Sequence, residues 1–157
     1  MPIKPIIKDT YLAVIKNSVG SKSFRNFYVL DRGKKIDVTK KGNLSCAWFV
    51  SVVLSLFNFI DSPHLTVNRV ERELKKSGWR EISKPKSGAV IIWGPASSGK
   101  NMLRRHIGFY VGSNKAISND SEKGYPVIHN WKFSKAKSPQ GRVIEAVLWN
   151  TKLDVKV

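Results

Sequence analysis

The longest apolar stretch of the chain is Asn43–Phe59, with the sequence NLSCAWFVSVVLSLFNF. From Ala47 onward only Ser51, Ser55 and Asn58 are polar, so helical spacing leaves no wide polar face. A helix that is apolar almost all round is normally buried. The pattern therefore predicts a buried helix that forms the core of the fold.

The segments around this helix have more ordinary patterns. Amphipathic helices are predicted over Asp9–Val19 and Thr66–Ser77, and a hairpin over Phe24–Leu30 and Lys35–Val38. Extended segments are predicted over Trp79–Ile82, Ala89–Trp93, His106–Gly112, Lys115–Asn119, Val127–Phe133 and Val143–Trp149. Helices followed by antiparallel strands indicate the α+β class.

The length of 157 residues predicts a single domain over residues 1–157. Within it, residues 1–42 form an N-terminal helix and hairpin extension, and residues 43–157 form the core. The first residues, MPIKPIIKDTYLAVIKNS, lack the continuous apolar run of a secretory signal. The buried helix is too short to span a membrane. We therefore expect a cytoplasmic protein without a transmembrane segment, with release to a cell wall as the alternative.

The charge is strongly positive. There are 28 Lys and Arg against 11 Asp and Glu, which gives a formal net charge of +17. A surface of this kind attracts polyanions such as nucleic acid, an anionic cell wall or an acidic membrane. The basic residues are scattered along the chain, so charge alone does not select the partner.

Cys46 is the only cysteine and lies at the predicted start of the buried helix. A single cysteine excludes an intramolecular disulfide and a zinc site built from several cysteines. The unpaired N–H groups and the positive dipole end of a helix stabilise a thiolate at this position. Judged alone, however, a single cysteine is more often an inert buried side chain.

A thiol nucleophile needs a base within hydrogen-bonding distance and a third polar group that orients the base. His106 is the candidate base, because it opens the predicted strand HIGFYVG. The other histidines, His64 and His129, have no short metal-ligand spacing with it or with each other. No metal and no cofactor are therefore expected.

Residues Gly94–Lys100, GPASSGK, follow a predicted strand and match the phosphate-binding pattern G-x-x-x-x-G-K. The next residue is Asn101 where that motif requires Ser or Thr to hold Mg²⁺. A strand-like segment also follows within a few residues, where a helix should begin. We expect a connecting loop and no ATP binding.

Three motifs together resemble one enzyme group. They are Cys46-Ala47-Trp48-Phe49, Lys86–Trp93 and His106–Gly112, and they resemble the NlpC-like and CHAP-type cell-wall cysteine peptidases over roughly residues 43–120. The resemblance implies a papain-like fold, in which the helix that carries the cysteine packs on an antiparallel sheet. It also implies Cys46 as nucleophile and His106 as base. One departure is Ala89, where the families have an acidic residue.

The third catalytic residue of these families falls at Ser118 by count. Asn119 beside it is chemically the better orienting group, although strand alternation would need a bulge to turn it inward. His129 is a more distant alternative. We take Asn119 as the orienting residue, which completes the predicted catalytic set of Cys46, His106 and Asn119.

The resemblance implies a cysteine peptidase or amidase that cleaves peptide or amide bonds, with peptidoglycan as the expected substrate. The backbone N–H of Cys46 would contribute to the oxyanion hole. The alternative is a non-enzymatic basic module that binds nucleic acid or an anionic wall on a degenerate hydrolase fold. Exposed aromatic residues such as Trp79 and Trp131 would then contribute to binding. A cytoplasmic amide substrate is a further alternative.

Overall fold

The computed structural model describes residues 1–96, 104–135 and 141–154. Within these ranges its helices are α1 (Ile7–Asn17), α2 (Cys46–Leu56) and α3 (Val67–Lys76), with 3-10 turns η1 (Lys22–Phe24) and η2 (Thr151–Asp154). The small sheet pairs β1 (Tyr28–Asp31) with β2 (Lys34–Asp37). The large sheet contains β3 (Arg80–Glu81), β4 (Val90–Trp93), β5 (His106–Gly112), β6 (Lys115–Asp120), β7 (Tyr125–Asn130) and β8 (Ile144–Trp149). These elements confirm the α+β class.

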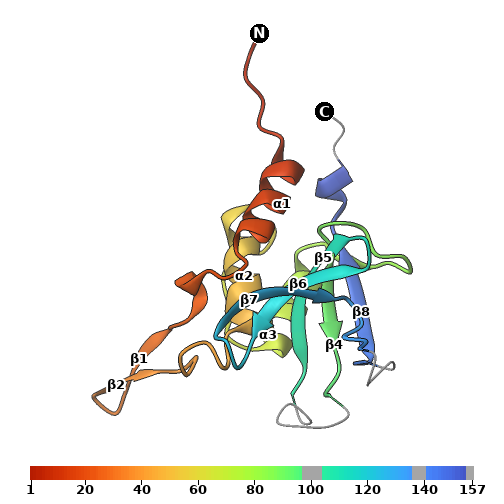
Figure 1. Ribbon diagram of the computed structural model, residues 1–157. Coiled ribbons are helices and arrows are strands. Elements are labelled where there is room, and N and C mark those ends of the chain that lie inside the picture. The colour runs from red at the N-terminus through yellow and green to blue at the C-terminus, as the bar shows by residue number, and fades with distance from the viewer. Residues whose placement is uncertain (97–103, 136–140, 155–157) are drawn as a thin grey trace.

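The large sheet is antiparallel throughout and has the strand order β3-β8-β4-β5-β6-β7 (Figure 1). Strands β4 to β7 follow one another as a meander, so neighbours in sequence are neighbours in space. Strand β8 instead returns to lie between β3 and β4. The C-terminal strand is therefore interior to the sheet.

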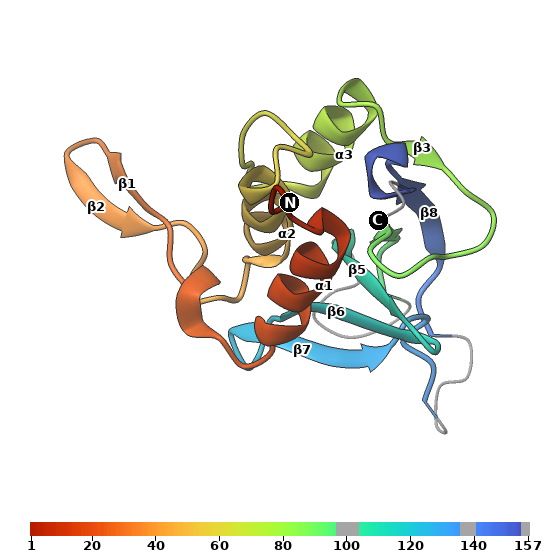
Figure 2. The ribbon, with the colours of Figure 1, turned by 90° about the horizontal axis from the view of Figure 1, so that it is seen from above.

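The three helices lie together beside the large sheet, and α2 is the central one (Figures 1 and 2). It contacts β5 and β6 directly, while α1 and α3 both contact α2. The side chains of α2 that face this core are fully buried, including Phe49, Val50, Val53 and Leu54. The Phe49 ring meets the Phe109 ring of β5 edge-on, with their centroids 5.5 Å apart. The prediction of a buried core helix is confirmed.

The N-terminal region contributes to the same core. Tyr11 of α1 is fully buried and packs edge-on against Phe57, Phe59 and Phe109. Its hydroxyl donates a 2.8 Å hydrogen bond to the carbonyl of Gly88, just before β4. The helix of the predicted extension is thus part of the core.

The β1–β2 hairpin projects away from the body of the molecule (Figure 2). Asp37 organises its base, because its carboxylate accepts hydrogen bonds from the backbone N–H groups of Phe27, Thr39 and Lys41. Burial raises the pKa of the Asp37 carboxyl, but these hydrogen bonds, with those from the Thr39 and Asn26 side chains, hold it well below its usual range. The hairpin leads directly into α2.

We predict that Tyr11→Phe lowers the free energy of unfolding by about 1–2 kcal/mol, because the buried Gly88 carbonyl loses its hydrogen-bond donor. Chemical denaturation measures the change. Tyr28→Phe is the matched control, since Tyr28 is 57% exposed and its hydroxyl should contribute less than about 0.5 kcal/mol. Equal effects of the two changes would contradict the assigned role of the Tyr11 hydroxyl.

Candidate active site

Cys46 is the first residue of α2, as its sequence position predicted. Its thiol is partly buried at the helix end, where the backbone amides of Ala47 and Ile107 are close enough to act on it as hydrogen-bond donors. Ile107 belongs to β5, so the helix start and the strand start meet at this sulfur. This contact joins two segments that are far apart in sequence.

His106 is the first residue of β5 and is paired in register with Trp93 of β4. Its ring packs against the Trp93 ring, with the centroids 5.5 Å apart, and against Phe133. Cys46 and His106 both line one cavity of about 490 Å³. The structure therefore brings the predicted nucleophile and the predicted base to the same cavity.

A chain of hydrogen bonds runs from His106 to the backbone of β7. The Nε2 atom of His106 is 2.9 Å from the Ser118 hydroxyl, and that hydroxyl is 2.7 Å from Nε2 of His129. The Nδ1 atom of His129 is 2.7 Å from the carbonyl oxygen of Asn130. Every member of this chain lies on β5, β6 or β7.

The donor and acceptor in each of these bonds can be assigned from chemistry. A carbonyl can only accept, so Nδ1 of His129 donates to Asn130, and in the neutral ring Nε2 must then accept. Ser118 therefore donates to His129 and accepts from Nε2–H of His106. This assignment leaves Nδ1 of His106 with a free lone pair, and Nδ1 has no hydrogen-bond partner among the described residues.

The electrostatic surroundings keep both members of the pair neutral. Burial, with smaller contributions from the positive charge of Arg142 and from the neighbouring His129, lowers the pKa of His106 to about 3. Burial also raises the pKa of the Cys46 thiol, against the opposing effects of the amides of Ala47 and Ile107 and the charge of Arg142. The expectation of a stabilised thiolate at the helix start is therefore wrong for this resting state, because desolvation outweighs the helix end.

Asn119 lines the same cavity but does not contact His106. Its side-chain amide donates a 2.7 Å hydrogen bond to the carbonyl of Gly42, while Oδ1 is buried without a partner among the described residues. The side chain that hydrogen-bonds to His106 is that of its neighbour Ser118. The physical reason is strand alternation, because β5 and β6 pair without a bulge at Gly108–Ser118.

Position 108 requires glycine because β5 and β6 approach each other closely here. A Cβ atom built on it would lie 2.7 Å from the Ser118 Cβ and 2.7 Å from the Ile117 carbonyl oxygen. The Cζ3 atom of Trp93 would lie 3.1 Å from the same Cβ. The absent side chain thus lets Ser118 lie beside β5, within reach of His106.

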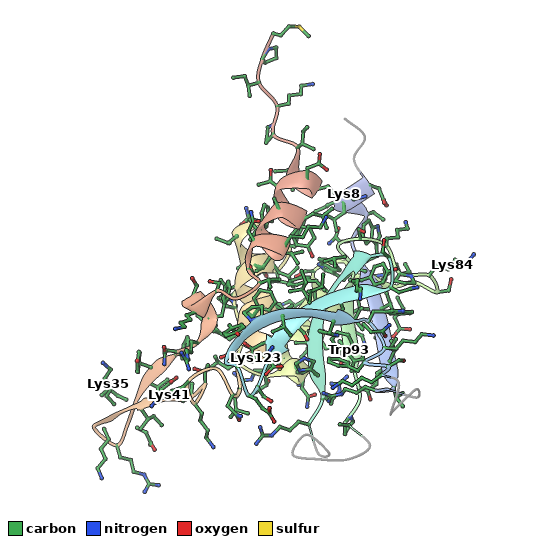
Figure 3. The ribbon with its side chains drawn as sticks, in the orientation of Figure 1. Lys8, Lys35, Lys41, Lys84, Trp93 and Lys123 are labelled. Atoms are coloured by element: carbon green, nitrogen blue, oxygen red, sulfur yellow. The ribbon has the colours of Figure 1, made fainter. Side chains whose placement is uncertain are left out.

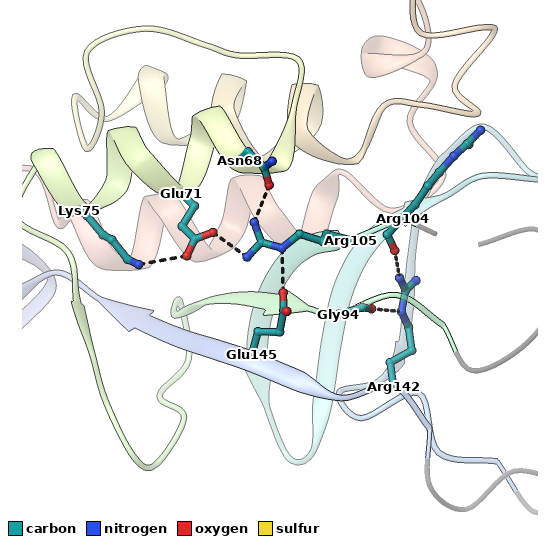
Figure 4. A network of polar contacts seen from close by, with 8 residues as sticks. All are labelled: Asn68, Glu71, Lys75, Gly94, Arg104, Arg105, Arg142 and Glu145. Carbon is teal, nitrogen blue, oxygen red and sulfur yellow. Dashed lines mark hydrogen bonds and ion pairs between the residues drawn. The ribbon is translucent and has the colours of Figure 1, made fainter. Parts of the chain in front are cut away.

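Three arginines line the cavity, and they differ in their partners (Figure 4). Arg105 contacts the carboxylates of Glu71 at 2.6 Å and Glu145 at 2.8 Å, so its charge is balanced. Within the described residues Arg142 donates only to carbonyl oxygens, from Nε to Gly94 at 3.1 Å and from Nη2 to Arg104 at 2.6 Å. No sequence motif marks Arg142, which follows a basic segment far along the chain from Cys46 and His106.

Other expectations can be placed on the structure. Most of the stretch Gly94–Lys100, from residue 97 on, lies outside the described residues. In the described ranges no three His, Cys, Asp or Glu residues gather as metal ligands, and no helix is long and apolar enough to cross a membrane. Trp79, expected at an exposed binding surface, is fully buried, and its indole N–H donates to the Phe59 carbonyl.

Comparison with known proteins assigns no family to this chain. It matches no protein-family model and no curated protein.

We predict that the low pKa of His106 makes the protein less stable in acid. Between its ordinary value of 6.5 and about 3, the unfolded ring binds a proton that the folded ring does not, so stability is lost as the pH falls through this window. Because the ring is partly exposed, we expect a loss of only about 1–2 kcal/mol. Urea unfolding of the wild type and of His106→Gln, at about pH 7 and about pH 4.5, measures the difference. Identical pH dependence in the two proteins would contradict the assignment.

Proposed function

We propose that the protein is a cysteine hydrolase that cleaves peptide or amide bonds, with Cys46 as nucleophile and His106 as base. The observation that carries this proposal is the hydrogen-bond chain from His106 through Ser118 to His129. It holds the imidazole in the tautomer whose unprotonated Nδ1 can accept the proton of a thiol. The thiol of Cys46 lies on the same cavity.

The neutral pair suits a mechanism in which proton transfer accompanies attack. Nδ1 of His106 takes the thiol proton as the sulfur adds to the carbonyl carbon of the substrate. The backbone N–H of Cys46 stabilises the oxyanion that forms. The imidazolium then gives its proton to the amine nitrogen as the C–N bond breaks, which leaves a thioester on Cys46. Water, deprotonated by the same histidine, hydrolyses the thioester and restores the thiol.

We also propose that the fold is of the papain-like kind. Three features support this: the cysteine begins a buried helix, the histidine begins an adjacent antiparallel strand, and the orienting group follows on the next strand. The order of these residues along the chain is the order that the NlpC-like and CHAP-type peptidases have. Here the orienting group is Ser118 with His129 behind it.

Peptidoglycan is the proposed substrate. The sequence resemblance favours it, and the charge is compatible with a polyanionic wall. The labelled lysines Lys35, Lys84 and Lys123 are exposed and belong to different parts of the molecule (Figure 3). Positive charge that is spread over the surface favours a general attraction to polyanions and does not form one defined binding site.

We predict that Cys46→Ala and His106→Gln each lower the release of amino groups from purified peptidoglycan by at least about a thousandfold. The double variant should be little worse than either single one, because the two residues act as a unit. His64→Gln is the matched histidine control, since His64 lies beside Glu73 and does not line the cavity. Binding of nucleic acid that survives in the double variant, with no cleavage of any wall preparation by the wild type, would refute the hydrolase proposal.

The orienting chain makes a separate prediction. Ser118→Ala should lower kcat by about 10- to 100-fold with KM preserved, because His106 loses the group that fixes its tautomer. His129→Gln should cost less than His129→Leu, since a glutamine oxygen can still accept from Ser118. Steady-state kinetics on a short amide substrate gives both constants. A loss confined to Asn119→Ala would restore Asn119 as the orienting residue.

A further inference from the structure

We propose that Arg142 forms a carboxylate-binding site beside Cys46, and that the substrate carries a carboxylate next to the amide that is cleaved. The second part rests on the proposed hydrolase function. The first part concerns the cavity alone and can be tested without any turnover.

The guanidinium of Arg142 is held in a fixed position. Its Nε and Nη2 donate to the carbonyls of Gly94, the residue after β4, and Arg104, two residues before β5 (Figure 4). An arginine has five N–H donors, so three have no hydrogen-bond partner among the described residues. The side chain lines the cavity together with Cys46 and His106. A rigid fork with unused donors matches the geometry of a carboxylate.

The charge of Arg142 has no carboxylate partner in the described part of the chain. The remaining residues, 97–103, 136–140 and 155–157, include no Asp or Glu. Asp120 also lines the cavity, but its Oδ1 accepts from the backbone N–H groups of Glu122 and Lys123. Burial lowers the pKa of Arg142, which reflects the cost of this unbalanced charge.

Arg105 provides the internal comparison. It lines the same cavity, yet Glu71 and Glu145 contact it on two sides and Asn68 contacts it on a third. Its donors and its charge are therefore occupied within the protein. Of these two partly buried guanidiniums, Arg142 is the one that an incoming anion can pair with.

Arg104, the third arginine of the cavity, is exposed and donates to the Asn43 side-chain oxygen at 3.4 Å, so its charge is screened by solvent. One partly buried guanidinium fits a singly charged carboxylate.

Arg142 acts electrostatically on the Cys46 thiol as well as on the cavity. A test must therefore separate recognition of an anion from stabilisation of the thiolate. Two alkylating reagents of similar size make this separation, because iodoacetate is a carboxylate and iodoacetamide is neutral. A change in thiolate population alters both rates equally, so the ratio of the rates reports only the attraction of the carboxylate.

The experiment measures the iodoacetate-to-iodoacetamide rate ratio at Cys46, the only thiol in the protein. We expect the ratio to fall about tenfold in Arg142→Gln. Arg32→Gln is the charge-matched control, because it removes one positive charge from the exposed turn of the β1–β2 hairpin and should leave the ratio unchanged. An unchanged ratio in Arg142→Gln, or an equal fall in both variants, would overturn the anion site.

A second measurement uses the wild type alone and remains valid if Arg142→Gln does not fold. Sodium acetate should slow the reaction of Cys46 with iodoacetamide more than sodium chloride does at the same ionic strength. Acetate occupies the guanidinium, while both salts screen charge equally. Equal slowing by the two salts would overturn the anion site.

The substrate part is tested with two short peptides that differ only in having a carboxylate or a carboxamide beside the scissile amide. We expect the wild type to prefer the carboxylate in kcat/KM by about tenfold, and Arg142→Gln to lose this preference. Cleavage of both peptides at equal rates would overturn this part while leaving the hydrolase proposal in place. A retained iodoacetate preference with no cleavage of either peptide would refute the hydrolase and support the anion site.

Discussion

The edge-on contact between Phe49 of α2 and Phe109 of β5 is the interaction on which the arrangement of this protein depends. Cys46 lies three residues before Phe49, and His106 lies three residues before Phe109. Packing these two rings together fixes the helix against the strand, so the starts of both elements reach the same cavity. Tyr11 packs on Phe109 from α1 and ties the N-terminal helix to the same point. The hydrophobic core thus positions the polar residues, and the core residue Trp93 packs directly against the His106 ring.

The polar chain on β5, β6 and β7 depends on a different constraint, which is that a backbone carbonyl cannot donate a hydrogen bond. The carbonyl of Asn130 determines the proton on His129, the direction of the Ser118 hydroxyl and finally the free nitrogen of His106. Serine is well suited to the middle position because its hydroxyl donates and accepts at once. An asparagine oxygen could orient His106 directly, but the side chain of Asn119 lies on the other side of β6.

The sequence predicted most elements because their patterns are strong and local. The apolar run of α2, the Gly-containing turns and the position of His106 at the start of a strand are readable from nearby residues alone. Asn119 is chemically suited to orient His106, but strand alternation brings Ser118 to the histidine and leaves Asn119 bonded to the Gly42 carbonyl. Trp79 was misplaced because a single aromatic residue beside charges does not reveal its burial. The position of Arg142 at the cavity and the position of β8 between β3 and β4 depend on contacts between segments that are distant in sequence. Local sequence patterns do not predict such contacts.

The basic residues behind the net charge of +17 differ in their surroundings and therefore in their effect on a partner. The lysines that project from the surface are hydrated and screened, so each has a weak and general effect on a partner. The guanidinium of Arg142 is partly desolvated, held by two carbonyls and directed at a cavity, so its field is screened less. Arg105 has the same chemistry, but Glu71 and Glu145 confine its influence to the cavity wall. Selectivity for an anion near Cys46 is therefore assigned to Arg142, the partly buried guanidinium that no carboxylate of the described residues contacts.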